Sequence, residues 1–173
     1  MIHTVVESPL GPLTLVADDE GRLAGLYMRD QRYRPADERF GDAVDLNPGS
    51  PPRPGSPEAV LAQAAEQLAE YFAGTRHALD VPQAPLGTQF QRQVWAALER
   101  IPYGETRTYA EVAEQIGRPT AVRAVGAAIG RNPLCVVVPC HRVLGTGGSL
   151  TGYAGGLERK RLLLDLESPV VNS

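Results

Sequence analysis

The stretch that decides the fold of the second half of the chain is "TYAEVAEQIGRPTAVRAVGAAIG", residues 108–130. Thr108 and Glu111 have the spacing of a capping box, which predicts a helix that ends at Gly117. Thr120 is expected to cap a second short helix. Two short helices joined by "GRPT" predict a helix-turn-helix. The bare pattern is weak evidence for DNA binding, because many helical hairpins share it.

The second of these helices has few long polar side chains. Arg123 is its single arginine, and most other positions are alanine or glycine. A helix that reads the major groove usually presents several long polar side chains to the base edges. A slim helix could instead approach the minor groove, which is only about 6 Å wide, and push one arginine into the base stack. The alternative is close packing on a neighbouring helix, and both can hold on different faces.

The rest of the second half is also mostly helical in pattern. Residues 87–102, "GTQFQRQVWAALERIP", begin with a capping box at Thr88 and Gln91 and end at Pro102. Their apolar face consists of Val94, Trp95, Leu98 and Ile101. We therefore predict a mostly α domain over residues 86–173.

The first half has the pattern of a small α/β domain, residues 1–85. A meander of short strands is predicted over residues 2–8, 11–18 and 22–28. A helix is predicted for residues 57–74, with Pro57 in its first turn and Gly74 after its end. Residues 77–83 are strand-like, and the Pro/Gly-rich segment near 46–57 predicts a mobile loop. We expect this domain to be a scaffold.

Charge and composition limit the classes of function. The net charge is −3, but residues 1–85 hold 7 Arg against 13 Asp and Glu, whereas residues 86–173 hold 10 Lys and Arg against 7 Asp and Glu. The acidic total argues only weakly against nucleic acid, because the charge of one face matters more than the sum. No apolar run has the length of a membrane span, and no signal peptide is evident, so a cytoplasmic protein is expected.

The ten residues "LCVVVPCHRV", 134–143, combine a cysteine and a histidine after an apolar run. The run predicts a buried strand that Pro139 ends, which places Cys140 where the strand opens into a loop or helix. Neighbouring strand residues point to opposite faces, so His141 can face the thiol only if the backbone turns after Pro139. A lone Cys-His pair is more often structural than chemical.

The other cysteine and the histidines predict no further chemistry. Cys135 lies inside the apolar run and is expected to be a small buried side chain. A redox pair of Cys135 with Cys140 would lack the Cys-x-x-Cys spacing. The two cysteines and His3, His77 and His141 have no zinc-ligand spacing, so no metal is predicted.

The residues around Cys140 resemble those of the O6-alkylguanine-DNA alkyltransferase family. The resemblance rests on "PCHRV", preceded by "RAVGAAIGRNP" and followed by "TGYAGGLERKRLLLDLE". It is close over roughly residues 88–167, including "IPYGETRTYAEVA", and covers the first half only in the order of elements. It implies a small antiparallel sheet with a helix, ribonuclease H-like, followed by the helix-turn-helix domain.

The resemblance also implies direct-reversal repair of DNA. Cys140 would accept the alkyl group irreversibly, so each molecule would act once. A relay of thiol, water, His141 and Glu167 would form the thiolate, which is the reactive species. Asn132 would be a hinge between the recognition helix and the active site, and Tyr109 would donate a hydrogen bond to the guanine ring.

The expected partner is double-stranded DNA with an O6-alkylguanine, bound through the minor groove and with the lesion flipped out. Arg123 would fill the vacated place in the stack. The expected DNA contacts are Tyr109, Arg118, Thr120, Ala121, Arg123, Ala124 and Gly126. The expected base pocket consists of Val143, Tyr153, Ala154 and Gly155.

One position of this pocket departs from the family. Some relatives have serine where this chain has Ala154, which keeps the backbone donor to O6 but loses a hydroxyl. The range of bulky alkyl groups accepted is therefore open, as are O4-alkylthymine repair and cooperativity on DNA. No cofactor or metal is expected. The protein is expected to be a monomer.

Three other classes of protein remain as alternatives. An alkyltransferase-like protein would bind the lesion without transfer, but Cys140 with His141 and Glu167 argues against it. A cysteine hydrolase would need an oxyanion hole and access for water, and it has no use for a helix-turn-helix. A transcriptional regulator is disfavoured because a single minor-groove arginine reads little sequence.

Overall fold

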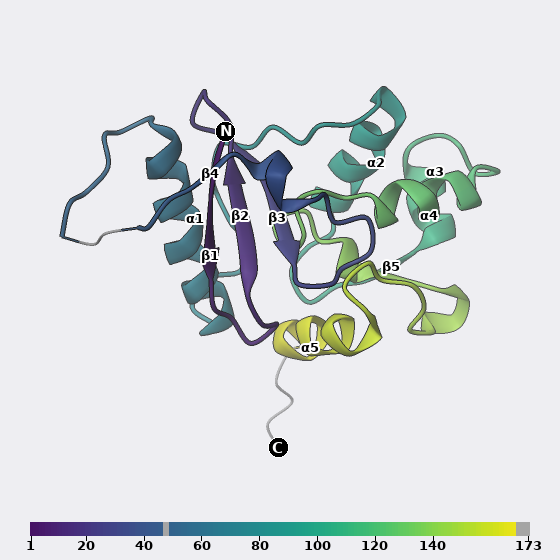
Figure 1. The fold of residues 1–173 in the computed structure, drawn as a ribbon. Helices are drawn as coiled ribbons and strands as arrows, with labels where there is room; N and C mark the ends of the chain where they lie inside the picture. Colours follow the sequence, from purple (N-terminus) through teal and green to yellow (C-terminus); the bar gives the residue numbers. More distant parts are fainter. Residues whose placement is uncertain (47–48, 169–173) are drawn as a thin grey trace, which may run out of the picture. The chain divides into compact units, whose positions relative to one another are not determined.

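A computed structural model of the chain describes residues 1–46 and 49–168, in two compact units (Figure 1). The first unit consists of Met1–Leu86 and the short segment Pro133–Val137. The second consists of Gly87–Asn132 and, among the described residues, 138–168. No described helix is both long enough and apolar enough to cross a membrane.

The first unit is built on a four-stranded sheet in the order β3-β2-β1-β4. Its strands are β1 (Ile2–Val6), β2 (Leu13–Ala17), β3 (Leu23–Met28) and β4 (Asp42–Ala43). The predicted meander is confirmed, with antiparallel pairing of β1 to β2 and of β2 to β3. The sheet is nevertheless mixed, because the short exposed strand β4 pairs parallel to β1.

The predicted helix is confirmed as α1 (Pro57–Phe72), which packs against β1, β2 and β3. Its N-terminus is capped by the Ser56 hydroxyl, which accepts from the Ala59 N–H at 3.2 Å. Leu61, Ala64 and Leu68 are buried on its inner face. Within the predicted loop 46–57, residues 47–48 lie outside the described residues, 49–56 are turns, bends and irregular chain, and Pro57 already belongs to α1.

The predicted strand over residues 77–83 is wrong. Only Gln83 pairs with the sheet, in an isolated parallel bridge to Leu23. Pro82 accounts for this, because proline has no N–H to donate to a ladder. Its carbonyl instead accepts from the Leu23 N–H at 2.7 Å.

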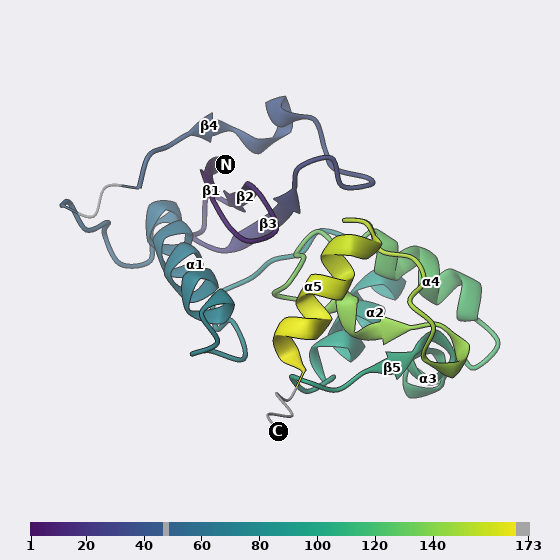
Figure 2. The same cartoon turned by 90° about the horizontal axis from the view of Figure 1, so that it is seen from below.

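The second unit is mostly helical (Figures 1 and 2). Its elements are α2 (Gln89–Glu99), β5 (Arg107–Thr108), α3 (Tyr109–Gln115), α4 (Val122–Gly130), β6 (Val143–Leu144), α5 (Leu157–Glu167) and two short 3-10 helices, η2 (Cys140–Arg142) and η3 (Thr146–Gly148). Both predicted capping boxes are present, at the starts of α2 and α3. α3 and α4 form the predicted helix-turn-helix, and α2 packs on both of them.

Two local predictions fail in the second half of the chain. Thr120 does not cap α4, because the residue that precedes the helix is Ala121 and no side chain caps it. The predicted strand over residues 134–138 is a buried turn, in which Val136 has a positive φ of 71°. Leu134 alone pairs with the sheet, in a bridge to Leu26. A β-branched residue in the left-handed region cannot continue a strand.

Candidate active site

Cys140 begins the 3-10 turn η2, directly after Pro139. The Cys140 N–H donates to the Val138 carbonyl at 2.7 Å, and the Arg142 N–H donates to the Pro139 carbonyl at 3.0 Å. The Asn132 side-chain amide donates to the same Val138 carbonyl at 2.9 Å. The backbone therefore turns after Pro139, and Asn132, two residues after the end of α4, is tied to the segment that carries the thiol.

His141 is completely buried and is held by the last residue of α5. Its Nε2 lies 2.8 Å from Oε2 of Glu167, which is itself 2% exposed. Arg142 donates to both oxygens of the same carboxylate, from Nε at 2.7 Å and from Nη2 at 2.9 Å. Two hydrogen bonds from a guanidinium favour an ionised carboxylate, so Glu167 is a fixed acceptor for His141.

The two ring nitrogens of His141 have different surroundings. If Nε2 carries the hydrogen and donates to Glu167, Nδ1 is an acceptor. No described residue forms a hydrogen bond with the buried Nδ1. Burial lowers the pKa of His141 below its ordinary 6.5, although Glu167 acts in the opposite direction. A neutral imidazole with an unoccupied acceptor can take a proton from a nearby group.

Tyr109, the first residue of α3, contacts the chain that precedes α5. The parallel pairing of Arg107 with Val143 brings the start of α3 beside the chain that follows η2. The Tyr109 hydroxyl lies 3.2 Å from the Thr151 carbonyl and 3.4 Å from the Gly152 carbonyl. Burial raises the pKa of Tyr109 above 10.0, so the phenol stays a donor at neutral pH.

The remaining residues of the predicted pocket line the same region of the chain. Val143 is fully buried, whereas Tyr153, Ala154 and Gly155 are half-buried. No described residue accepts a hydrogen bond from the Ala154 N–H. This segment therefore offers a backbone donor to an incoming group.

The outer face of α4 is formed by small side chains and one arginine. Arg123, Ala124 and Ala127 are exposed, and Arg123 makes no hydrogen bond or ion pair with a described residue. The inner face is held by Trp95, whose indole N–H donates to the Ala128 carbonyl at 2.8 Å. A Cβ added at Gly126 would lie 3.8 Å from the Tyr109 ring, so α4 and Tyr109 are neighbours.

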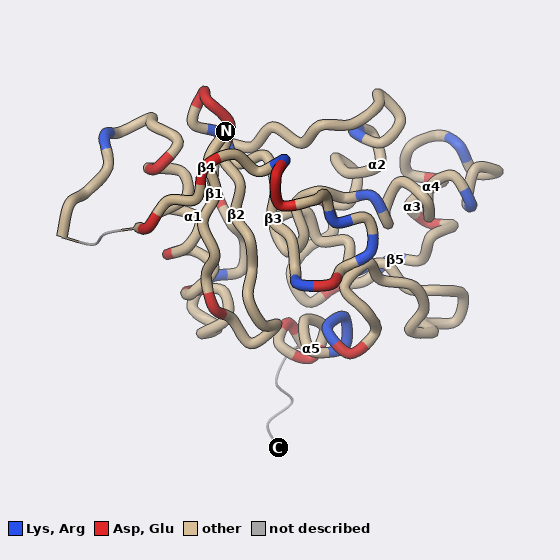
Figure 3. Tube along the Cα trace, in the orientation of Figure 1, with Lys and Arg blue, Asp and Glu red and all other residues tan. Residues whose placement is uncertain are grey.

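Of the other residues expected to contact DNA, Arg118 and Thr120 are exposed in the turn between α3 and α4. The Arg118 guanidinium lies 5.5 Å from the centre of the Phe90 ring. Ala121 is half-buried. Basic positions are blue in Figure 3, and several mark the chain around α3 and α4.

Two buried charged residues of the site were not predicted from the sequence. Arg142 is 7% exposed and links Glu167 to the Ile101 carbonyl, to which Nη1 donates at 2.6 Å. Lys160 is fully buried in α5. For Arg142 the sequence has no separate signal beyond its place next to His141. For Lys160 there is one, because it is the single lysine among 17 basic residues.

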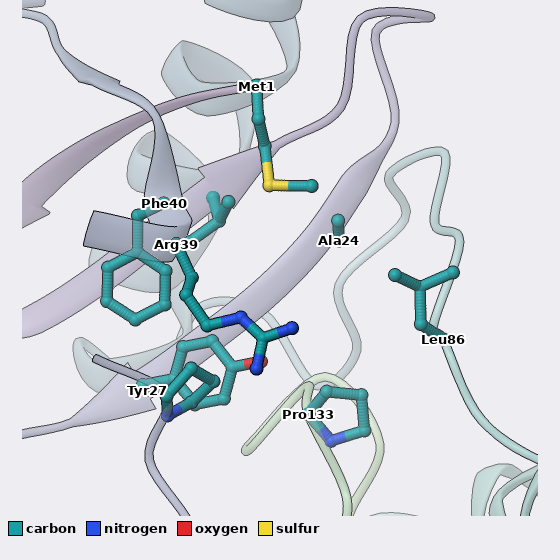
Figure 4. Close-up of a pocket in the computed structure, with 9 residues that line it drawn as sticks. Met1, Ala24, Tyr27, Arg39, Phe40, Leu86 and Pro133 are labelled. Carbon is teal, nitrogen blue, oxygen red and sulfur yellow. The ribbon is translucent and has the colours of Figure 1, made fainter. Parts of the chain in front are cut away.

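A hollow of about 310 Å³ lies in the first unit (Figure 4). Tyr27 and Phe40, whose rings stack with centroids 5.4 Å apart, line one side of it together with Arg39. No cysteine, histidine or carboxylate is among the described residues that line it. The described residues also contain no cluster of three or more histidine, cysteine or acidic side chains that could hold a metal.

The second unit thus defines a class of protein: a helix-turn-helix domain that carries a buried cysteine next to a histidine–glutamate pair. Two family models match the chain, the ribonuclease-like domain of 6-O-methylguanine DNA methyltransferase over residues 1–85 and its DNA binding domain over residues 89–169. The chain belongs to this family.

Curated relatives and solved structures agree with this assignment. The chain is 44% identical over 167 residues to the methylated-DNA–protein-cysteine methyltransferase of Methanosarcina acetivorans, covering 96% of this chain and 98% of the relative. It is 49% identical over 165 residues to that of Mycolicibacterium paratuberculosis, covering 95% and 91%. The crystal structure of Mycobacterium tuberculosis OGT in complex with DNA is similar at a TM-score of 0.81 and 45% identity, covering 98% and 96%. The predicted two-domain fold is confirmed.

Proposed function

We propose that the protein repairs DNA by transferring the alkyl group of O6-alkylguanine to the sulfur of Cys140. The observation that carries the proposal is the turn η2, which places the cysteine directly before a buried His141 held by Glu167 at 2.8 Å. The curated relatives are named for the same transfer, from methylated DNA to a protein cysteine.

The chemistry follows from the protonation states of the site. The thiol of Cys140 gives its proton to Nδ1 of His141, directly or through a water, and Glu167 stabilises the imidazolium. The thiolate attacks the alkyl carbon, so a sulfur–carbon bond forms and the carbon–O6 bond breaks. The electron pair of that bond stays on guanine, which takes up a proton and leaves neutral. A hydrogen bond from Tyr109 to the ring assists this departure.

The target base must leave the stack, because the thiol is buried and the base lies inside a duplex. The slim exposed face of α4 fits the minor groove, and Arg123 takes the vacated place. Thr120, Ala121, Ala124, Gly126 and Arg118 form the surrounding DNA contact. In the pocket, the Ala154 N–H donates to O6, and Val143, Tyr153 and Gly155 form the wall.

The product thioether has no nucleophile that reverses it, so each molecule acts once. The reaction needs Cys140 in its reduced form, and neither cysteine forms a disulfide in the structure. This requirement suits a reducing compartment, and we place the protein in the cytoplasm as a monomer.

The test is a titration of the protein with a duplex that contains one O6-methylguanine, followed by base analysis of the DNA. We expect repaired guanine to reach a plateau at one per protein molecule. Continued turnover would contradict the proposal. Tight binding of the lesion without any repair would identify the alternative, a protein that flags the lesion without transfer.

The role of Arg123 has its own test. We expect Arg123→Ala to lower the rate of transfer from duplex DNA about 10- to 100-fold, with Arg161→Ala as the exposed control on α5. Binding to DNA should weaken with salt, because basic side chains displace counterions. An unchanged rate in the Arg123→Ala variant would contradict the proposal that α4 contacts the DNA.

A further inference from the structure

Lys160 is the chain's single lysine, and it lies fully buried within the candidate active site. Its Nζ donates to the Thr151 carbonyl at 2.8 Å and to the Gly152 carbonyl at 3.0 Å. Burial lowers its pKa from 10.5 to about 8. Arginine could not serve in the same way, because its guanidinium is larger and does not lose its proton at such a pH.

The same two carbonyls face the hydroxyl of Tyr109, at 3.2 and 3.4 Å. The Lys160 ammonium also lies 6.0 Å from the centre of the Tyr109 ring. A phenol has one hydrogen to donate, whereas an ammonium has three. The carbonyls therefore keep a donor if Tyr109 turns its hydrogen elsewhere, and no buried acceptor is left without a partner.

We propose that Lys160 is a positioning residue, which holds the Thr151 and Gly152 carbonyls so that the Tyr109 hydroxyl is free to donate to the flipped base. The proposal rests on the proposed function, since it assumes that Tyr109 contacts the base and Cys140 accepts the alkyl group. Before the base arrives, the Tyr109 hydroxyl is hydrogen-bonded to these carbonyls. When it turns to the base, the carbonyls keep their hydrogen bonds from Lys160. Gly152 adopts a positive φ of 53°, and a Cβ there would lie 3.3 Å from the Tyr109 hydroxyl, so the contact is close.

The positive charge of Lys160 also acts on the nucleophile. Cys140 and His141 of η2 and Tyr109 of α3 are the titratable groups near it, and a thiolate at Cys140 favours the charged lysine. The ammonium in turn favours the thiolate, as opposite charges do. When Lys160 loses its proton, above about pH 8, both the third donor and this charge are lost. The transfer rate should then fall although more thiol is ionised.

The experiment compares Lys160→Met, Lys160→Arg and the exposed control Arg161→Met in single-turnover transfer from a duplex with one O6-methylguanine. Rates are measured at saturating DNA from pH 6 to about 9.5. We expect Lys160→Met to lower the maximal rate about 10- to 100-fold, while the DNA concentration for half-maximal rate stays unchanged. Its rate should no longer fall above about pH 8. Arg161→Met should behave as the wild type.

A double-mutant cycle with Tyr109→Phe tests the coupling. Because part of the effect of Lys160 acts through Tyr109 and part acts through its charge, the loss in the double variant should be smaller than the product of the two single losses. Independent, multiplying losses would overturn the proposal, as would a wild-type maximal rate and pH profile in Lys160→Met. Should Lys160→Met not fold, Lys160→Arg decides: its charge persists, so retention of the wild-type fall above pH 8 would overturn the proposal.

Failure of the proposed function gives a different result. In that case Cys140→Ser would still accept the methyl group, or the wild type would accept none. If Cys140→Ser is inactive and the wild type accepts one methyl group, only the role of Lys160 is at stake.

Discussion

Cys135 and Cys140 lie five positions apart, form no disulfide, and are 0% and 3% exposed. Their surroundings differ. Cys135 lies in the turn that belongs to the first unit, with its sulfur 3.5 Å from the Gln31 side-chain oxygen. Cys140 lies in the second unit, on the turn that carries His141 and its partner Glu167. Burial therefore does not distinguish a structural thiol from a reactive one, whereas a neighbouring base does.

The largest expected effect comes from replacing each of the two cysteines separately by serine. We expect Cys140→Ser to abolish methyl transfer, by at least about 1,000-fold, because a hydroxyl is much less acidic than a thiol and is a much weaker nucleophile towards an alkyl carbon. Cys135→Ser should leave the rate per folded molecule unchanged. Single-turnover assays with the methylated duplex measure both. Equal losses in the two variants would break the comparison.

A second difference between the surroundings of Cys140 and of Cys135 is the carboxylate that holds His141 beside Cys140. Glu167→Gln removes the carboxylate that holds both His141 and Arg142. We expect the transfer rate to fall about 100-fold, since the imidazolium loses its counter-charge. The free energy of unfolding should fall by about 3–5 kcal/mol, because Arg142 is left as a buried unpaired charge. Asp165→Asn, on the exposed side of the same helix, is the control, and urea unfolding gives the stability. A stable and fully active Glu167→Gln variant would contradict this role.

The surroundings of Cys135 should affect stability alone. The Gln31 side-chain oxygen accepts from the Met28 N–H at 2.7 Å, in a buried position. We expect Gln31→Leu to lower the free energy of unfolding by about 1–3 kcal/mol, because that N–H loses its partner. The transfer rate per folded molecule should stay at the wild-type level. A slower transfer rate at unchanged stability would mean that the surroundings of Cys135 take part in the chemistry.

The smallest expected effect is the dependence of stability on pH. Burial lowers the pKa of His141 below 6.5 in the folded state, so the unfolded chain binds more protons in the range just below 6.5. Stability from this residue is therefore present above pH 6.5 and lost as the pH falls through that range. We expect the loss between pH 7.5 and 5.5 to be smaller in His141→Gln by about 1 kcal/mol. Urea unfolding at both pH values measures it, and identical losses would show that His141 is not buried as a neutral ring.

Much of the fold follows from local signals in the sequence. Thr88 with Gln91, and Thr108 with Glu111, define the starts of α2 and α3 because a capping box involves only four consecutive residues. Pro57 marks the start of α1 because proline is favoured at the first position of a helix, which is also a local signal. Strand β4 was not predicted, since its two exposed residues are paired only through β1, far back in the sequence.

The active-site segment shows where local reasoning ends. The apolar run 134–138 has the composition of a strand, but Val136 adopts a left-handed conformation and the chain turns. No local pattern indicates that conformation. The buried charges were also missed, because Arg142 finds Glu167 25 residues further along the chain. The resemblance to the family supplied Glu167, Asn132 and Tyr109 as site residues, whereas spacing alone did not.

The most direct test of the central claim locates the transferred group. The wild-type protein is incubated with a duplex containing one O6-methylguanine, digested, and mapped by tandem mass spectrometry. We predict one methyl group on the peptide that contains Cys140, none on Cys135, and no further gain with excess DNA. A methyl group on Cys135, or an unmodified protein that still binds the lesion tightly, would contradict the account.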